Sequence, residues 1–159
     1  MLALLAVAVL AGPAAAQPSD GQIFEDWRLR CGKAEAAAPP PCHIFQTVVV
    51  SQTGQPFLYV AAGYPPEGAG GATLFLTLPL GIHLPTGVSL TVDRGQPVPV
   101  PVVHCDRDGC HARLALDRRL IKSLQAGLVA RVAFQDGVGQ AITVPVSLKG
   151  FTAALKAVR

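Results

Sequence analysis

The sequence predicts an all-β fold, a mainly antiparallel β-sandwich or barrel-like domain with one short internal helix and a short C-terminal helix. Three observations carry this prediction. About nine short apolar runs follow one another, and several alternate apolar with polar residues, the period of a strand with one buried face. Turn-forming residues separate the runs. The 16 glycines and 14 prolines are spread along the chain and disfavour long helices.

The expected strands lie within apolar runs that are separated by Gln-Thr-Gly-Gln, Asp-Arg-Gly, Asp-Arg-Asp-Gly and Gln-Asp-Gly. These breaks are typical of the tight turns that connect antiparallel neighbours. Strands at this spacing favour a sandwich or a barrel. The runs are 24–31, 43–52, 56–62, 73–80, 87–93, 97–105, 110–116, 128–134 and 141–148.

The run "PVPVPVVHC" differs from the other expected strands because it contains three prolines. Pro97, Pro99 and Pro101 alternate along it and therefore share one face or edge. A central strand needs its N–H donors, so we expect this run at a sheet edge or in a bulged segment. Such an edge is open to a partner protein, although proline more commonly protects an edge from one.

Two segments break the strand pattern. In "DRRLIKSLQAG", Asp117 is placed to cap a helix, apolar residues recur at helical spacing, and Gly127 follows the end. The tail "SLKGFTAALKAV" carries Phe151 and Leu155 on one face and predicts a terminal helix that docks on the sheets. We expect Trp27, Phe151 and Leu155 to bury against each other or against the sheet.

The first residues predict export. An apolar run follows Met1, and residues 1–16 end in an Ala-x-Ala pattern typical of signal peptidase cleavage after Ala16. The run is shorter than the about 20 apolar residues that a membrane-spanning helix needs. The basic residue that normally precedes the run is missing. We therefore expect residues 1–16 to be a signal peptide, residues 17–159 a single domain, and the location the periplasm or the outer envelope.

The 4 cysteines are expected to form disulfides, since export leads to an oxidising compartment. Four cysteines allow three connectivities, and sequence alone does not choose among them. We favour the pairing that closes local loops, Cys31 with Cys42 and Cys105 with Cys110. Neither pair is a Cys-x-x-Cys motif, which argues against a thioredoxin-like redox role.

The stretch "VVHCDRDGCHARL" raises the alternative of a metal site, because histidine and cysteine both suit zinc. If Cys105 and Cys110 face each other across a hairpin, with 106–109 as its loop, then His104 faces His111 on the opposite face of the ribbon. The four side chains then do not reach one ion. A two-histidine site for a transition metal stays open beside a cross-strand pair without a ligand. The sequence favours the latter and predicts no metal and no cofactor.

No motif predicts catalysis. The sequence has no Gly-x-Ser-x-Gly elbow and no His-Glu-x-x-His, and "GYPPEGAGGATL" lacks the Lys-Ser/Thr of a phosphate loop. His43 and His83 each lie beside apolar residues and are expected to be hydrogen-bonded polar residues rather than ligands. We therefore expect no catalytic residues and no enzyme.

The charge pattern argues against nucleic acid as a partner. A net charge of +3 is small and dispersed. Basic residues do gather in sequence around the first expected helix. They indicate either an ordinary solvated face or a surface for an acidic partner or lipid headgroups, and so leave peripheral membrane association open. They are Arg113, Arg118, Arg119, Lys122 and Arg131.

Taken together, the segments 24–46, 78–93, 105–117 and 144–155 resemble the invasion-associated locus B family. They contain "FEDWRLRC…PCHIFQ", "LPLGIHLPTGVSLTVD", "C…GCHARLALD" and "VPVSLKGFTAAL". The resemblance covers nearly all of the expected mature chain, in the right order. It implies an exported bacterial protein, periplasmic or envelope-associated, with one β-rich domain. The family carries no established catalytic residues, so the resemblance transfers no active site.

Two functions of different classes follow from these observations, and a third stays open. The first is a non-catalytic envelope module that binds a protein, either a subunit of a membrane complex or a host surface protein. Loops would supply its contacts, above all the loop 63–71, "GYPPEGAGG". The alternative is a periplasmic stress or chaperone-like factor that acts on apolar segments of exported proteins. A small enzyme without a recognisable motif is the third.

Overall fold

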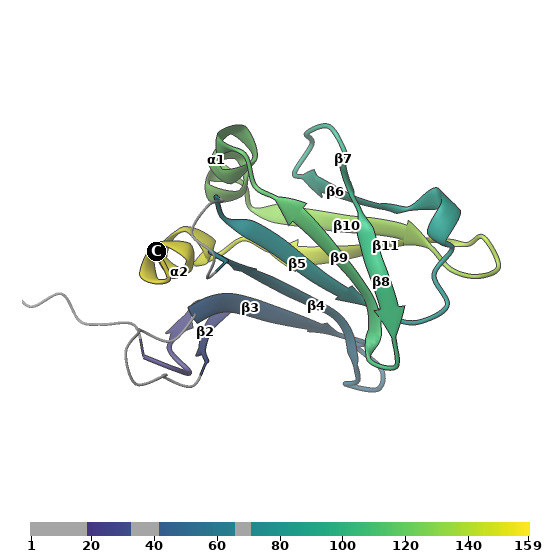
Figure 1. Cartoon of the computed structure of the whole chain (residues 1–159), viewed down its shortest axis with the longest axis horizontal. Helices are drawn as coiled ribbons and strands as arrows, with labels where there is room; N and C mark the ends of the chain where they lie inside the picture. The colour runs from purple at the N-terminus through teal and green to yellow at the C-terminus, as the bar shows by residue number, and fades with distance from the viewer. Residues whose placement is uncertain (1–18, 33–41, 66–70) are drawn as a thin grey trace, which may run out of the picture.

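The computed structural model describes residues 19–32, 42–65 and 71–159, which form two antiparallel sheets packed face to face (Figure 1). The larger sheet has seven strands in the order β1-β2-β3-β4-β5-β9-β8, and the smaller has four in the order β11-β10-β6-β7. This arrangement confirms the predicted all-β sandwich with two short helices. The expected leader, residues 1–16, lies outside the described residues.

The strands follow the predicted runs closely. The seven-stranded sheet contains β1 (Ile23–Phe24), β2 (Trp27–Cys31), β3 (Cys42–Val49), β4 (Pro56–Gly63), β5 (Thr73–Leu78), β8 (Val102–Asp106) and β9 (Gly109–Ala115). The four-stranded sheet contains β6 (Val88–Val92), β7 (Val98–Val100), β10 (Val129–Gln135) and β11 (Ala141–Ser147), and a short 3-10 helix, η1 (Leu84–Thr86), precedes β6.

The described residues form eleven strands rather than about nine, because two runs split. The first run breaks at Glu25, whose φ of 53° lies in the left-handed region and turns the chain between β1 and β2. The proline-rich run breaks at Pro101, where the chain leaves one sheet and enters the other. Strand β7 is an edge of the four-stranded sheet and β8 an edge of the seven-stranded sheet. The expectation of an edge position is therefore confirmed, twice over.

The core lies between the two sheets, because alternate residues of each strand point inward. In β10 the buried residues are Ala130, Val132 and Phe134, and the residues between them are less buried. Ile44 and Leu76 of the larger sheet belong to the same buried cluster. This pattern is the strand period that the sequence displays.

Helix α1 (Arg118–Ala126) begins as predicted, with the Asp117 carboxylate accepting a hydrogen bond from the Leu120 N–H at 2.7 Å. Its end also lies where the sequence predicts it, at Gly127, but the reason for the glycine differs. Gly127 has φ −78°, so the glycine is not needed there for a left-handed turn. A side chain at position 127 would instead meet Val92 and Asp93, which explains the glycine by close packing.

Helix α2 (Phe151–Ala157) docks on the core at the end of the sandwich where α1 also lies (Figure 1). Phe151, Ala154 and Leu155 are buried. The Trp27 ring is buried against Phe151, and its Nε1–H donates a hydrogen bond to the Ser147 carbonyl at 3.0 Å. The predicted burial of the tryptophan with this helix is confirmed. Neither helix of the described residues is long and apolar enough to cross a membrane.

Candidate functional site

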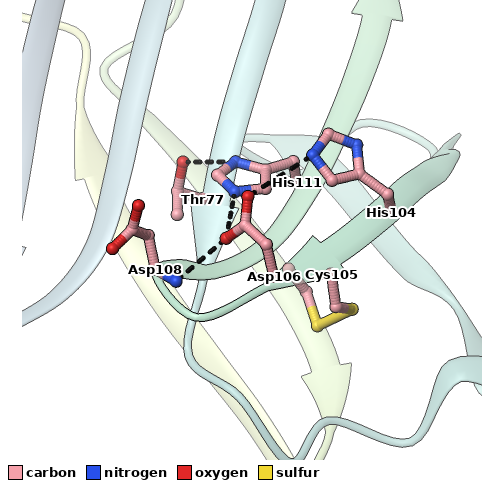
Figure 2. A network of polar contacts seen from close by, with 7 residues as sticks. Thr77, His104, Cys105, Asp106, Asp108 and His111 are labelled. Carbon is pink, nitrogen blue, oxygen red and sulfur yellow. Dashed lines mark hydrogen bonds and ion pairs between the residues drawn. A yellow bond between two sulfur atoms is a disulfide. The ribbon is translucent and has the colours of Figure 1, made fainter.

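The hairpin formed by β8 and β9 contains the cysteines and histidines that the sequence analysis singled out (Figure 2). The ladder pairs His104 with His111, Cys105 with Cys110 and Asp106 with Gly109. Because successive residues of a strand point to opposite faces, the two histidines lie on one face of the ribbon and the two cysteines on the other. This register is the predicted one, but the loop is shorter: Asp106 and Gly109 belong to the ladder, so only residues 107 and 108 turn the chain.

Both cysteine pairs form disulfides in the favoured connectivity. Cys31 bonds to Cys42 across β2 and β3, and Cys105 bonds to Cys110 across β8 and β9. The thiols of the hairpin are therefore not available as metal ligands. The four-ligand zinc alternative is excluded, on geometry and on chemistry.

Asp106 lies beside both histidines, a contact that the hairpin pattern alone did not predict. Its Oδ1 lies 3.1 Å from His111 Nε2, and its Oδ2 lies 3.6 Å from His104 Nε2. The two imidazole rings lie 4.7 Å apart between centroids. The backbone N–H of Asp108 donates to the Asp106 carboxylate and, together with His111, lowers the pKa of Asp106. The carboxylate is therefore held ionised beside the two rings.

A fourth side chain fixes the orientation of one ring. Thr77, opposite His111 on β5, places its Oγ1 3.2 Å from His111 Nδ1 (Figure 2). With Nδ1 directed at the threonine, Nε2 is left to face Asp106. His104 and Asp106 are exposed, whereas His111 is half-buried against the sheet.

The same outer face of the seven-stranded sheet carries a row of paired residues that crosses five strands. Cross-strand pairs connect Arg28, Phe45, Ala61, Phe75 and Arg113 in that order. The row thus has an arginine at each end and aromatic rings between them.

Two further residues extend this row. The guanidinium of Arg30 lies 4.7 Å from the centroid of the Phe45 ring, and Tyr59 stacks on Phe45 at 5.5 Å. Arg113 lies 5.1 Å from the centroid of the Phe75 ring in the same way. We call this region the arginine–aromatic surface. It consists of Arg28, Arg30, Phe45, Tyr59, Phe75 and Arg113.

An apolar hollow of about 310 Å³ opens on the arginine–aromatic surface. Tyr59, Phe75 and Tyr64 supply aromatic walls, and Ala61 and Gly63 leave room because their side chains are small or absent. Because Ala61 and Gly63 fill little space on this face of β4, the hollow can accept an apolar side chain of another molecule.

His43 borders this hollow, and its Nε2 lies 3.3 Å from the Tyr59 hydroxyl. Burial lowers the pKa of His43, and the nearby charge of Arg30 lowers it further, against the opposing effect of Asp20. Burial raises the pKa of Tyr59. His83 hydrogen-bonds to Thr86 at 2.7 Å. Both histidines thus have polar partners, as expected from the sequence.

The basic residues near α1 do not form one surface. Arg113 lies on the outer face of the seven-stranded sheet, whereas Arg131 belongs to β10 of the other sheet and donates to the Asp93 carbonyl at 2.8 Å. Arg118, Arg119 and Lys122 are exposed on α1. These five basic residues, which are close in sequence, thus lie on three different elements: one on each sheet and three on α1. The centre of the loop 63–71, residues 66–70, lies outside the described residues.

The fold and these surfaces define a disulfide-clasped β-sandwich with a polar and aromatic outer face on its larger sheet. The pattern of the invasion associated locus B (IalB) protein family matches residues 27–159, so the chain belongs to this family. The resemblance noted from the sequence motifs is confirmed.

Relatives and a solved structure agree with this membership. Two invasion protein B homologs, both from Brucella abortus, are 27% identical over 135 residues, which cover 84% of this chain and 76% of theirs. The crystal structure of invasion associated protein B from Bartonella henselae has a TM-score of 0.73 at 22% identity, covering 86% of this chain and 92% of that one. This structural likeness shows that the fold is shared.

Proposed function

We propose that this chain is an exported, non-catalytic protein of the bacterial envelope that binds a partner protein through its arginine–aromatic surface. The partner would be a subunit of a membrane complex or a host surface protein. The segment bound there carries acidic side chains for the arginines and an apolar side chain for the hollow beside Phe75. The arginine–aromatic surface is the observation that carries this proposal.

Charge favours an acidic segment. Among the described residues, none of Arg28, Arg30 and Arg113 forms an ion pair with a carboxylate, and the side chains of all three are exposed. Arg30 and Arg113 are held over aromatic rings, which orders each guanidinium before a partner arrives. An arginine fixed in this way loses less conformational freedom on binding and offers a planar fork to a carboxylate.

Composition also favours a protein partner. Arginine and tyrosine are among the residues most enriched at the hot spots of protein interfaces. Hot-spot residues contribute most to affinity when they surround a well-packed pocket from which water is excluded. The hollow of about 310 Å³ is large enough for single side chains and small for an extended apolar segment. This favours a defined partner over the chaperone-like alternative, which needs a broad apolar surface.

Export rests on several features of the chain. Residues 1–16 have the composition of a signal peptide. The two disulfides persist in oxidising compartments such as the periplasm. Two relatives are named invasion protein B homologs, and the family resemblance implies an exported bacterial protein. We therefore place residues 17–159, as a single domain, in the periplasm or the outer envelope.

The test is co-purification from native envelope membranes, followed by mass spectrometry, with a variant matched to a control. The double variant Arg30→Gln and Arg113→Gln removes two charges from the arginine–aromatic surface. The control, Arg118→Gln and Arg119→Gln, removes two exposed charges from α1. We expect one partner at fixed stoichiometry, captured about tenfold less by the first variant and equally by the control, since paired charges contribute strongly at a desolvated interface.

Two outcomes would overturn the proposal. Equal capture of the partner by both double variants would show that the arginine–aromatic surface is not the binding site. Capture of a broad set of exported proteins without fixed stoichiometry would favour the chaperone-like alternative.

A further inference from the structure

We propose that His104, Asp106 and His111 form a binding site for a divalent transition-metal ion of the late first row, such as Zn²⁺ or Cu²⁺. We call these three residues the hairpin triad. This inference does not depend on the proposed binding function, because it rests on the hairpin and not on the arginine–aromatic surface.

The spacing of the ligand atoms fits such an ion. The two imidazole nitrogens and the carboxylate oxygen of the hairpin triad lie within 4.8 Å of one another. The closest distances from the Asp106 carboxylate to the rings of His111 and His104 are 3.1 and 3.6 Å. Ligand atoms about 2.0–2.1 Å from a tetrahedral Zn²⁺ are separated by about 3.3 Å, so small side-chain rotations bring all three atoms to one ion.

The strand geometry holds the three side chains on one face. His104 and Asp106 are two residues apart on β8, and His111 is the cross-strand neighbour of His104. Asp106 lies opposite Gly109, which has no side chain to cover the carboxylate. The disulfide between Cys105 and Cys110 lies on the other face of the ribbon and fixes the register of the same two strands.

An outer contact prepares His111 as a ligand. Thr77 Oγ1 lies 3.2 Å from His111 Nδ1, which leaves Nε2 for the ion (Figure 2). Histidines that bind metals commonly donate their other ring N–H to such a partner, which fixes the tautomer and the plane of the ring. The backbone N–H of Asp108 anchors the Asp106 carboxylate at 2.9 Å in a comparable way.

The ligand set selects the kind of ion. Two imidazoles suit zinc, copper and nickel, whereas calcium and magnesium prefer sites made of oxygen ligands alone. Copper(II) binds a given set of nitrogen and oxygen ligands more tightly than zinc does. His104 and Asp106 are exposed, so water completes the coordination from the solvent side.

The test is calorimetric titration of the oxidised full-length protein, without a polyhistidine tag, with zinc chloride or copper sulfate. We expect one ion per chain and tighter binding of copper. Asp106→Asn preserves the shape of the turn and should weaken zinc binding at least tenfold, while His104→Ala should abolish stoichiometric binding. His83→Ala is the matched control, because His83 is also exposed and hydrogen-bonded to a threonine, and it should leave binding unchanged.

Thr77→Val tests the outer contact. It should weaken zinc binding about tenfold, the lower end of the effect of such partners. In the wild-type protein, ¹⁵N spectra of the imidazole ring should show His111 protonated at Nδ1 when zinc is bound, a readout that loss of packing alone does not give. Melting in EDTA checks that each variant is folded.

The proposal is wrong if the wild-type protein binds neither ion stoichiometrically. It is equally wrong if His104→Ala binds zinc as the wild-type protein does, or if His83→Ala loses binding to the same extent as Asp106→Asn.

Discussion

Trp27 meets Phe151 edge-on, with ring centroids 5.2 Å apart and planes inclined by 67°. The tryptophan begins β2 and the phenylalanine begins the last helix, so this contact joins the two ends of the described fold. Both side chains are 1% exposed. Aromatic pairs in this geometry add to the stabilisation that comes from burying their surface.

We expect Trp27→Ala to lower the free energy of unfolding by about 3–5 kcal/mol, the usual cost of removing a buried aromatic side chain. The change also leaves the Ser147 carbonyl without the indole donor. Urea denaturation monitored by circular dichroism measures the effect. Val138→Ala is the control, because Val138 is 90% exposed and should change stability by no more than about 0.5 kcal/mol. A wild-type midpoint for Trp27→Ala would contradict the burial.

Gly150 lies between β11 and α2 in a left-handed conformation that residues with a side chain rarely adopt. Its φ is +82°, and a Cβ atom there would collide with the Phe24 carbonyl. Gly139 has a similar φ of +84° but open space around it. Gly139→Ala should therefore cost about 1–2 kcal/mol, from backbone strain alone. Gly150→Ala should cost about 1–3 kcal/mol more, from the collision. Equal midpoints in urea denaturation of the two variants would show that the collision is relieved without cost.

Local pattern predicted most of the secondary structure. The strand period of β10 and the Asp117 cap of α1 are visible in the sequence because each depends on neighbours along the chain. The split at Pro101 was not predicted. The three prolines indicate an edge position, but one edge strand would account for them as well as two. The passage of the chain from β7 in one sheet to β8 in the other depends on how distant segments pack, which the local sequence does not show.

The hairpin could likewise be predicted from local sequence, whereas the arginine–aromatic surface could not. The pairing of His104 with His111 followed from the hairpin, but Asp106 was interpreted only as a turn residue. The alternation that pairs the histidines also places Asp106 on their face, so this signal was present in the sequence. The row from Arg28 to Arg113 was not accessible in this way, because it depends on the pairing of β5 with β9, which are far apart along the chain.

The two disulfides should contribute differently to stability. In the chain-entropy treatment, closing loops of about 12 and about 6 residues stabilises the fold by ~2.8 kcal/mol for Cys31–Cys42 and ~2.2 kcal/mol for Cys105–Cys110. Replacing each pair by serine and measuring urea denaturation tests this order. A larger loss for the Cys105–Cys110 variant would show that the hairpin bond acts mainly through the folded state. Intact-mass analysis of the wild-type protein should find no free thiol.

His43 should make stability depend on pH. Burial is the first cause that lowers its pKa, and the charge of Arg30 adds to it, while Asp20 opposes both. In the unfolded chain a histidine titrates near its ordinary pKa of about 6.5. As pH falls below that value, the unfolded state takes up a proton before the folded state does, so the free energy of unfolding falls until the folded pKa is passed. The groups nearest His43 are the Arg30 guanidinium, the Asp20 carboxylate and the Tyr59 hydroxyl.

The measurement is urea denaturation at several pH values between 7.5 and 5, in EDTA, for the wild-type protein and two variants. His43→Gln removes the titrating ring, so its stability should fall less steeply below pH 6.5 than that of the wild-type protein. His83→Gln, which replaces an exposed histidine, is the matched control for exchanging one imidazole ring for an amide. The other histidines are common to all three proteins and cancel in the comparison. If His43→Gln and the wild-type protein have the same slope, the ring is not kept neutral by its place beside Tyr59 and Arg30.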